Sequence, residues 1–414
     1  MNRSFYALLV SQTSTNLGFA LYTMVVVLHL YNGTGSTTLA AGVTLVSVVS
    51  RMISTIYLPT ISDKLSLPKL LMASQSGQLV LLIVLFVLFF QELSSALILA
   101  IFLLLGFISF LNGFFSPVKS SIVKSIVSED NRMRANSLIS SVDQTFLFAG
   151  WTFGGVLLAF AGKQTTLILT ICLFLTSMVC MSLINVNSSS TNIQSQESLI
   201  MRLTTGWKYL FKHKGLRILI IMDLMEAWVG TIWIGAVTLT YVEDALGKGE
   251  IWWGYINGGY YLGTILGGFL VYRFSNVMHG RLTVFMMIGS ATFGILTFMY
   301  GFISEPFIAL LLVCWMGPSY QLRDLAQETM FQNSADERTL TKILAARSTL
   351  IQLIFIFSIL GIGILTDLIG VRLVYIFSGL LLIVSSLFGI INLHIRKLGS
   401  SLESEGYKQE IIEK

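Results

Sequence analysis

Twelve long apolar stretches, separated by short polar segments, follow one another along the chain. A helix needs about 20 apolar residues to cross the ~30 Å hydrocarbon core of a membrane. The stretches lie at residues 6–30, 39–61, 70–91, 96–118, 137–160, 166–186, 216–241, 251–272, 282–303, 307–330, 343–366 and 372–394. The pattern predicts an all-α integral membrane protein with twelve transmembrane helices. The first stretch is too long for a cleavable signal sequence, so we expect it to remain as the first helix.

The composition supports the same class of protein. Hydrophobic residues make up 54% of the 414 residues and charged residues only 11%, whereas a soluble chain carries roughly 25% charged residues. The three cysteines lie inside apolar stretches without metal-ligand spacing, so we interpret them as packing residues. The sequence also lacks a nucleotide-binding loop and a Ser/His/Asp constellation. We therefore expect no enzymatic activity, no cofactor and no metal site.

Lysine and arginine are distributed unevenly between the two sets of loops. If the N-terminus lies inside, 21 of the 26 Lys and Arg residues fall in cytoplasmic loops and termini, and only Lys163, Lys248 and Arg372 fall in the opposite loops. Cytoplasmic loops carry an excess of these residues. We therefore expect a protein of the cell (inner) membrane with both termini in the cytoplasm. The net charge of +5 follows from this topology, and we expect no nucleic-acid partner.

The longest polar interruption divides the chain into two halves of six stretches each. Residues 187–214 begin with a Ser/Asn/Gln-rich link and end with large apolar residues at helical spacing among lysines. This pattern predicts an amphipathic helix on the cytoplasmic surface. The expected domains are an N-terminal bundle at 1–186, this linker at 187–214, a C-terminal bundle at 215–394 and a tail at 395–414.

A short repeat indicates that the two halves are copies. The segment "SEDNR" (128–132) follows the fourth stretch and "SADER" (334–338) follows the tenth, and the same offset of 206 places Gly155 on Gly361. Parallel six-helix repeats around an axis along the membrane normal are typical of transporters. The chain is therefore expected to bind its solute between two half-bundles and to expose it alternately to either side.

Two loops between stretches resemble the cytoplasmic signature of the major facilitator superfamily. They are "PTISDKLSLPK" (59–69) and "GFLVYRFSNVMHGR" (268–281), in which Asp63 and Lys64 occupy the acidic and basic positions of the first loop. Tyr272 stands where the second loop would carry an acid. In that family such loops latch the two halves together, which implies this role for Asp63 and Lys64. Arg132 and Arg273 are further latch candidates, and charge capping of helix ends is the alternative.

Glycines interrupt the fifth stretch in "FAGWTFGGVLLAF" (148–160). The segment "GWTFGG" resembles the superfamily's antiporter motif, with Trp151 at the position of a proline. Small residues let helix backbones approach closely in lipid, so these glycines predict a helix interface, which a second ladder on the eighth stretch could complete. That interface is either a surface on which the halves rock or static packing. The candidates are Gly150, Gly154, Gly155, Gly259, Gly263 and Gly267.

More of the chain is similar to one branch of the family. The segments "LYNGTGS" (30–36), "PVKSSIVKSIVSEDNRMRANSL" (117–138) and "WWGYINGGYYLGTILGG" (252–268) together resemble the macrolide-efflux-like exporters. The resemblance implies a proton-coupled antiporter, a secondary transporter that exports a small organic solute.

Four ionisable residues lie at membrane depth, where such residues mark functional sites. Asp223 and Glu226 share one helix face at i, i+3 spacing. Two carboxylates in a cavity of low dielectric would repel each other, so one of them should hold and exchange a proton. A structural ion pair with Arg323 or Arg217 is the alternative. Arg51 and Arg323 are candidate substrate anchors, with an Arg51–Asp143 pair as the alternative for the first.

Uncharged polar and aromatic side chains are the remaining candidates for the substrate site. Gln12 and Asn16 on the first stretch could orient a substrate by hydrogen bonds, although bonding between helices is as reasonable. Trp228 and Trp233 could line the same cavity or anchor the helix at the lipid interface.

The charges within the membrane also bear on the substrate. Two arginines and several acids suit a zwitterionic or polycarboxylate solute, so an exporter of metallophores, such as siderophores or staphylopine-like opines, is the alternative to a drug (multidrug-resistance) exporter. A lipid translocase is a further alternative. The expected partners are the solute, protons and membrane lipids, and we expect a monomer.

Overall fold

The computed structural model describes residues 3–34, 37–184, 199–233, 235–278 and 280–392. Within these ranges the secondary structure is helical, with one short 3-10 segment and one π segment and no strand. The Ser/Asn/Gln-rich link before residue 199 and the tail after residue 392 lie outside the described residues. The all-α fold class is confirmed, because near-continuous apolar sequence can satisfy its backbone hydrogen bonds only within helices when it lies in lipid.

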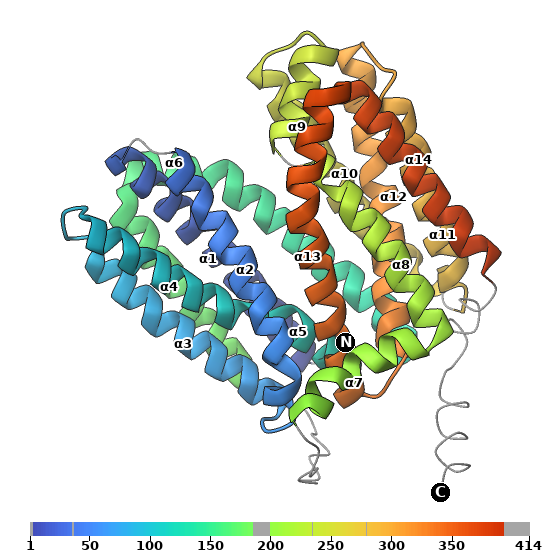
Figure 1. The fold of residues 1–414 in the computed structure, drawn as a ribbon. Coiled ribbons are helices and arrows are strands. Elements are labelled where there is room, and N and C mark those ends of the chain that lie inside the picture. The colour runs from blue at the N-terminus through green and yellow to red at the C-terminus, as the bar shows by residue number, and fades with distance from the viewer. Residues whose placement is uncertain (1–2, 35–36, 185–198, 234, 279, 393–414) are drawn as a thin grey trace, which may run out of the picture. The chain divides into compact units, whose positions relative to one another are not determined.

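The first half of the chain forms six helices, and a seventh follows in the linker (Figure 1). Their bounds are α1 (Arg3–Thr34), α2 (Thr37–Ser62), α3 (Leu67–Leu88), α4 (Ser95–Gly113), α5 (Phe115–Ile126), α6 (Glu129–Ser182) and α7 (Leu199–Lys212).

The second half begins with a broken helix and continues with five long ones. The elements are α8 (Lys214–Val229), η1 (Gly230–Trp233), α9 (Gly235–Thr240), η2 (Tyr241–Ala245), α10 (Glu250–Met278), α11 (Leu282–Tyr300), α12 (Pro306–Asn333), α13 (Glu337–Ile369) and α14 (Val371–Ile391).

The length and mean hydropathy of each helix decide whether it is counted as a membrane span. Among the described residues, eight helices are long and apolar enough to cross a membrane, and the broken pair Lys214–Trp233 and Val237–Ala245, bent by 59°, would make nine. Three predicted stretches, 137–160 on α6, 251–272 on α10 and 307–330 on α12, are not among these nine. Twelve spans therefore stay a prediction.

Helix α6 combines two predicted stretches in one element. The backbone at Gly162 departs from helical geometry, with φ 78° and ψ 170°. A residue with a side chain rarely adopts a positive φ, so glycine is required at this break. The break lies between the fifth and sixth predicted stretches, where the sequence predicts a loop.

The chain forms two compact units that are not simple halves of the sequence. Unit 1 contains residues 1–127, 145–206 and 341–349, and unit 2 contains residues 128–144, 207–340 and 350–414. The first part of α6, up to residue 144, therefore belongs to unit 2, and residues 341–349 of α13 belong to unit 1. The predicted domain boundaries stay predictions.

Unit 1 has an apolar core with a polar seam through it. The core includes Tyr22, Ile101, Leu105 and Phe174, none of which is exposed. The seam consists of Ser11 and Thr15 on α1, Gln75 on α3 and Ser177 on α6, which are joined by side-chain hydrogen bonds of 2.7–3.3 Å.

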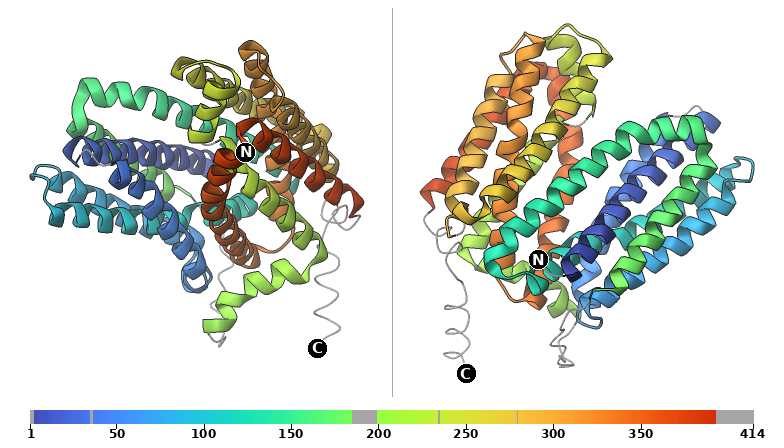
Figure 2. Two further views of the ribbon diagram at one scale, coloured as in Figure 1. Left: turned by 45° about the horizontal axis from the view of Figure 1, so that its top comes forward. Right: turned by 180° about the vertical axis from the view of Figure 1, so that it is seen from behind.

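Unit 2 packs α10, α11, α12 and α14 side by side, with α8 against α14 (Figure 2). Its core is rich in aromatic rings. Tyr241, Tyr300 and Tyr375 are fully buried and lie with ring centroids 4.3–5.1 Å apart. The Tyr241 hydroxyl donates to the carbonyls of Tyr300 (2.5 Å) and Ile303 (3.0 Å), so this apolar core also fixes the outer end of the broken helix.

Each glycine ladder packs closely on a helix of its own unit. A Cβ on Gly150 would lie 2.8 Å from Leu17 of α1, and one on Gly154 would lie 3.0 Å from Leu21 of α1. These contacts lie within unit 1. The surroundings of Gly155 lie outside what the structure describes.

The second ladder packs on α12. A Cβ on Gly259 would lie 2.7 Å from Leu310, a Cβ on Gly263 would collide with the Cys314 carbonyl, and one on Gly267 would lie 2.5 Å from the Cα of Pro318. The ladders lie in different units, so their suggested pairing stays a prediction. The contacts described above are those that each ladder makes inside its own unit.

Candidate functional site

The strongest candidate site is an ionic cluster buried in unit 2. Arg323 of α12 lies with its Nη2 2.9 Å from Asp223 and its Nε 2.8 Å from Glu226, both on α8. The exposed fractions of the three side chains are 6%, 3% and 10%. The structure therefore brings together three predicted site residues, and it realises the pairing with Arg323 that the sequence left open.

The neighbouring helices hold this cluster in place. Ser290 of α11 donates to the second oxygen of Glu226 at 3.4 Å. The adjacent Gly289 has no room for a side chain, since a Cβ there would lie 2.6 Å from the Arg323 backbone nitrogen. Gln327, one turn beyond Arg323, donates to the Leu219 carbonyl of α8 at 3.2 Å. The glycine on α11 and the hydrogen bond from the Gln327 amide of α12 to α8 thus fix the position of the guanidinium.

The cluster carries an excess of acid. Asp324 lies 3.8 Å from the Nη1 of Arg323, and its side chain is 35% exposed. Counted as ionised, Arg323 therefore faces three carboxylates. A buried charge without compensation is costly, so this arrangement is suited to binding a further positive charge, either a proton or a cationic group.

Aromatic rings connect the cluster to the core of unit 2. The phenol groups of Tyr260 and Tyr320 are close enough to Glu226 and Asp324 to interact with them electrostatically. Trp233 stacks on Tyr260, with ring centroids 5.7 Å apart and an interplanar angle of 8°. Trp233 is therefore linked to the cluster through Tyr260, a residue that sequence reasoning missed although it lies beside the glycine ladder.

Trp228 does not belong to the ionic cluster. Its ring lies against Gly361 of α13, where a Cβ would lie 2.9 Å from the ring. It lines an apolar cavity with residues of α13 and α14. Trp228 is two residues beyond Glu226 on α8, which places the two side chains on different faces of the helix.

The substrate-site candidates of unit 1 lie on α1 and α2. Gln12 is buried, and Asn16 is partly buried one turn further along α1. Arg51 on α2 donates from its Nε to the Ser47 carbonyl at 3.3 Å, and its guanidinium lies 5.4 Å from the centre of the Phe19 ring. Arg51 forms no ion pair with a carboxylate among the described residues of unit 1, and Asp143 belongs to unit 2, so the suggested Arg51–Asp143 pair stays a prediction.

The predicted latch residues are divided between the two units. Asp63 forms an ion pair with Lys342, with 2.9 Å between Oδ2 and Nζ, and both side chains are buried. Lys64, next to Asp63, is exposed. Sequence reasoning missed Lys342, which lies near the start of α13. Its position four residues after the "SADER" repeat is the feature of the sequence that could have drawn attention to it.

The arginine candidates behave differently from each other. Arg132 donates to the side chain of Asn333 at 2.5 Å, whereas Arg273 is exposed beside Phe274. Arg134, which the sequence did not single out, donates to the Tyr272 hydroxyl at 2.9 Å. The phenol at the position of an acid in the loop signature therefore accepts a hydrogen bond from arginine.

Within the described ranges, no group of three or more His, Cys, Asp and Glu side chains is arranged to hold a metal ion.

The sequence matches a family model and curated relatives over most of its length. The model described as Major Facilitator Superfamily matches residues 6–353. The MFS-type transporter YfmI of Bacillus subtilis (strain 168) is 48% identical over 401 residues, which cover 96% of this chain and 98% of that protein. The MFS-type transporter YjbB of the same organism is 28% identical over 389 residues, which cover 94% of this chain and 95% of that protein.

Solved structures share the fold at low sequence identity. An outward-facing bacterial homologue of the iron transporter ferroportin has a TM-score of 0.76 at 14% identity, with 94% of this chain and 99% of that chain covered. The E. coli fucose:proton symporter FucP has a TM-score of 0.71 at 12% identity, with 94% and 98% covered. At such identities the likeness concerns the fold alone.

Proposed function

Because the chain belongs to the major facilitator superfamily of membrane transporters, we propose that it exports a small organic solute from the cytoplasm in exchange for protons. The observation that carries this proposal is the buried Arg323 cluster, in which one guanidinium compensates two carboxylates directly. The fold supplies transport as such, and the cluster supplies a place where a proton can be bound and released.

Glu226 is the better proton carrier of the two paired acids. Its side chain is 10% exposed against 3% for Asp223. Its second oxygen has only the 3.4 Å contact with Ser290, which is long for a hydrogen bond between oxygens. Protonation of Glu226 would leave the Arg323–Asp223 pair intact and electrically balanced, so the proton can be exchanged without leaving Arg323 uncompensated.

Arg51 supports a substrate with an anionic group. A guanidinium at mid-membrane without a carboxylate partner is costly unless a ligand provides the opposite charge. The acid excess around Arg323 in turn favours a cationic group or a proton. These two observations favour a zwitterionic or polycarboxylate solute, as in metallophore export, over a neutral drug.

The orientation and direction of transport rest on the sequence. The excess of Lys and Arg in one set of loops supports a cell-membrane protein with cytoplasmic termini. The "GWTFGG" motif and the similarity to macrolide-efflux-like exporters support efflux. For Asp63 the buried ion pair with Lys342 supports a latch role, whereas the exposure of Lys64 and Arg273 makes them weaker latch candidates.

Flux in proteoliposomes tests the proposal, with labelled erythromycin in one arm and a labelled aminopolycarboxylate in the other. Glu226→Gln should abolish uphill transport driven by a pH gradient but keep downhill exchange, because the amide mimics the permanently protonated acid. Glu243→Gln, at an exposed acid of η2, is the matched control and should behave as wild type. Full gradient-driven transport by Glu226→Gln would show that the acid is structural.

A further inference from the structure

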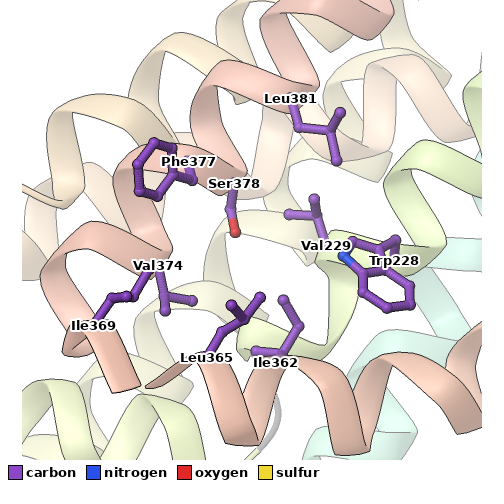
Figure 3. Close-up of a pocket in the computed structure, with 9 residues that line it drawn as sticks. All are labelled: Trp228, Val229, Ile362, Leu365, Ile369, Val374, Phe377, Ser378 and Leu381. Carbon is purple, nitrogen blue, oxygen red and sulfur yellow. The ribbon is translucent and has the colours of Figure 1, made fainter. Parts of the chain in front are cut away.

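The apolar cavity beside Trp228 lies in unit 2, apart from the ionic cluster. It has a volume of about 280 Å³ and lies between the end of α8, the outer part of α13 and the first half of α14 (Figure 3). Eight of its nine lining residues are hydrophobic, and the ninth is Ser378. Since no ionisable side chain lines it, the cavity is suited to an uncharged ligand.

The end of α8 creates this cavity. The helix stops at Val229 before Gly230, and the Trp228 carbonyl accepts a hydrogen bond from Ser358 of α13. Thr231 shares a 2.5 Å hydrogen bond with the same serine hydroxyl. Gly361, one turn beyond Ser358, leaves space for the Trp228 ring. The break of α8 is therefore fixed to α13 in a way that turns the indole toward α14.

Two hydrogen-bond donors are directed into this apolar space. Figure 3 shows the hydroxyl oxygen of Ser378 and the indole nitrogen of Trp228 turned toward the space between the three helices. Ser378 is 5% exposed. Within the part of the chain that the structure describes, neither group has a hydrogen-bond partner. Trp228 is half-buried, so both donors border the cavity and an acceptor atom of a ligand can reach them.

The cavity is accessible from the membrane. Phe377 and Leu365, which line it, are 57% and 38% exposed, whereas Val374 and Ile362 at its inner wall are buried. Both α13 and α14 are among the helices long and apolar enough to span a membrane. An exposed apolar edge on two such helices is suited to the entry of a ligand from the bilayer.

We propose that this cavity is a binding site for an uncharged, lipid-soluble molecule that carries a hydrogen-bond acceptor such as a carbonyl oxygen. The acceptor lies between the hydroxyl of Ser378 and the N–H of Trp228, and the apolar body of the molecule fills the space against α13 and α14. A cavity of about 150 Å³ already accommodates benzene, so this one accommodates a molecule of two rings. The site is independent of the proposed proton coupling at Glu226.

Photolabelling with benzophenone tests the site, because this neutral two-ring ketone combines the expected shape with the expected acceptor. On irradiation its carbonyl abstracts a hydrogen atom from a nearby C–H bond, and the two radicals join in a C–C bond. The purified protein in phosphatidylcholine nanodiscs is labelled over a range of concentrations, and adducts are located by mass spectrometry. Saturable adducts on the cavity residues of α13 and α14 are expected.

Substitutions distinguish the hydrogen bonds from simple partitioning into lipid. Trp228→Phe and Ser378→Ala each remove one donor and should raise the half-saturating benzophenone concentration about fivefold. Leu365→Phe fills the exposed edge and should prevent saturable labelling. Ser385→Ala is the matched control, because Ser385 is a buried serine of α14 whose hydroxyl also lacks a partner but does not line the cavity.

Three results would overturn the proposal. Adducts that spread without saturation over all lipid-facing helices would mean that there is no site. Wild-type concentrations for both Trp228→Phe and Ser378→Ala would mean that the donors hold no acceptor. Saturable labelling in detergent that disappears in nanodiscs would mean that an acyl chain of the bilayer occupies the cavity.

Discussion

Each unit buries a polar assembly where three helices meet, and the two assemblies differ in charge. Unit 1 holds a neutral seam in which Ser177 contacts Ser11, Thr15 and Gln75 at 2.7–2.9 Å. Unit 2 holds the charged cluster of Arg323, with two carboxylates at 2.8–2.9 Å. Both assemblies join helices that are distant in the sequence, and both are almost fully buried.

The difference concerns what each assembly can respond to. Hydroxyl and amide groups do not change charge in the physiological pH range, so the seam of unit 1 can only hold α1, α3 and α6 together. Carboxylates can take up a proton, and each uptake changes the charge balance around Arg323. We therefore expect the seam to affect stability alone and the cluster to affect both stability and pH-dependent transport.

Removal of Arg323 should have the largest effect. Arg323→Met leaves Asp223 and Glu226 buried without their counter-ion, which should cost about 3–5 kcal/mol of stability. Thermal unfolding in detergent, followed by size-exclusion chromatography, measures the loss. The triple variant Arg323→Met, Asp223→Asn, Glu226→Gln should recover most of the stability but no gradient-driven transport. If the single variant is as stable as wild type, the cluster is not compensated by Arg323.

Arg51 tests whether unit 1 also contains a functional charge. Arg51→Ala removes a guanidinium that no described carboxylate balances, so we expect little loss of stability. A hydrogen bond to a charged group contributes about 1.5–3 kcal/mol, and uptake of an anionic solute should therefore show a KM increased about 10- to 100-fold. Arg51→Lys should be intermediate, since an ammonium lacks the fork geometry. An unchanged KM with Arg51→Ala would place the anion elsewhere.

The seam of unit 1 should respond as a structural element. Ser177→Ala leaves Gln75 without its 2.7 Å partner in a fully buried position, which should cost about 1–3 kcal/mol. Thermal unfolding and flux at several pH values are the measurements. The pH dependence of transport should match that of wild type. A shifted pH dependence would show that the two assemblies are coupled, and the comparison would fail.

The smallest effect is expected where a glycine has space around it. A Cβ on Gly258 of α10 would meet nothing within 4 Å, unlike one on its neighbour Gly259. Gly258→Ala should stabilise the helix by about 0.5–1 kcal/mol, whereas Gly259→Ala should destabilise the protein. The difference in unfolding temperature between the two variants checks this. Equal shifts would mean that α10 does not pack closely on α12.

Several features of the site were accessible from the sequence. The i, i+3 spacing of Asp223 and Glu226 places both on one face of α8, and an arginine at membrane depth on α12 predicts a partner. The latch position of Asp63 followed from its loop signature. Lys342, Asn333 and Ser290 could not be predicted as partners, because each is brought to its contact by the packing of helices that are far apart in the chain.

The glycine ladders show the limit of sequence patterns most directly. Spacing at i, i+4 indicates a surface of close approach, but it does not identify the helix that occupies that surface. Gly154 packs on α1 and Gly263 on α12, within different units. The pattern alone does not name these partners, because any small residue permits close contact with any helix.

The sequence by itself indicated a membrane protein, the positions of its helices and its family. Hydropathy, segment length and short loop motifs can be read locally along the chain. Only the tertiary structure decided which charges compensate each other: Arg323 with Asp223 and Glu226, Lys342 with Asp63, and no described acid with Arg51. It also separated Trp228 from Trp233, although both lie within one short segment. Trp233 lies in the 3-10 segment η1, whose side-chain spacing differs from that of the α-helix before it, so its direction does not follow from the helical spacing of α8.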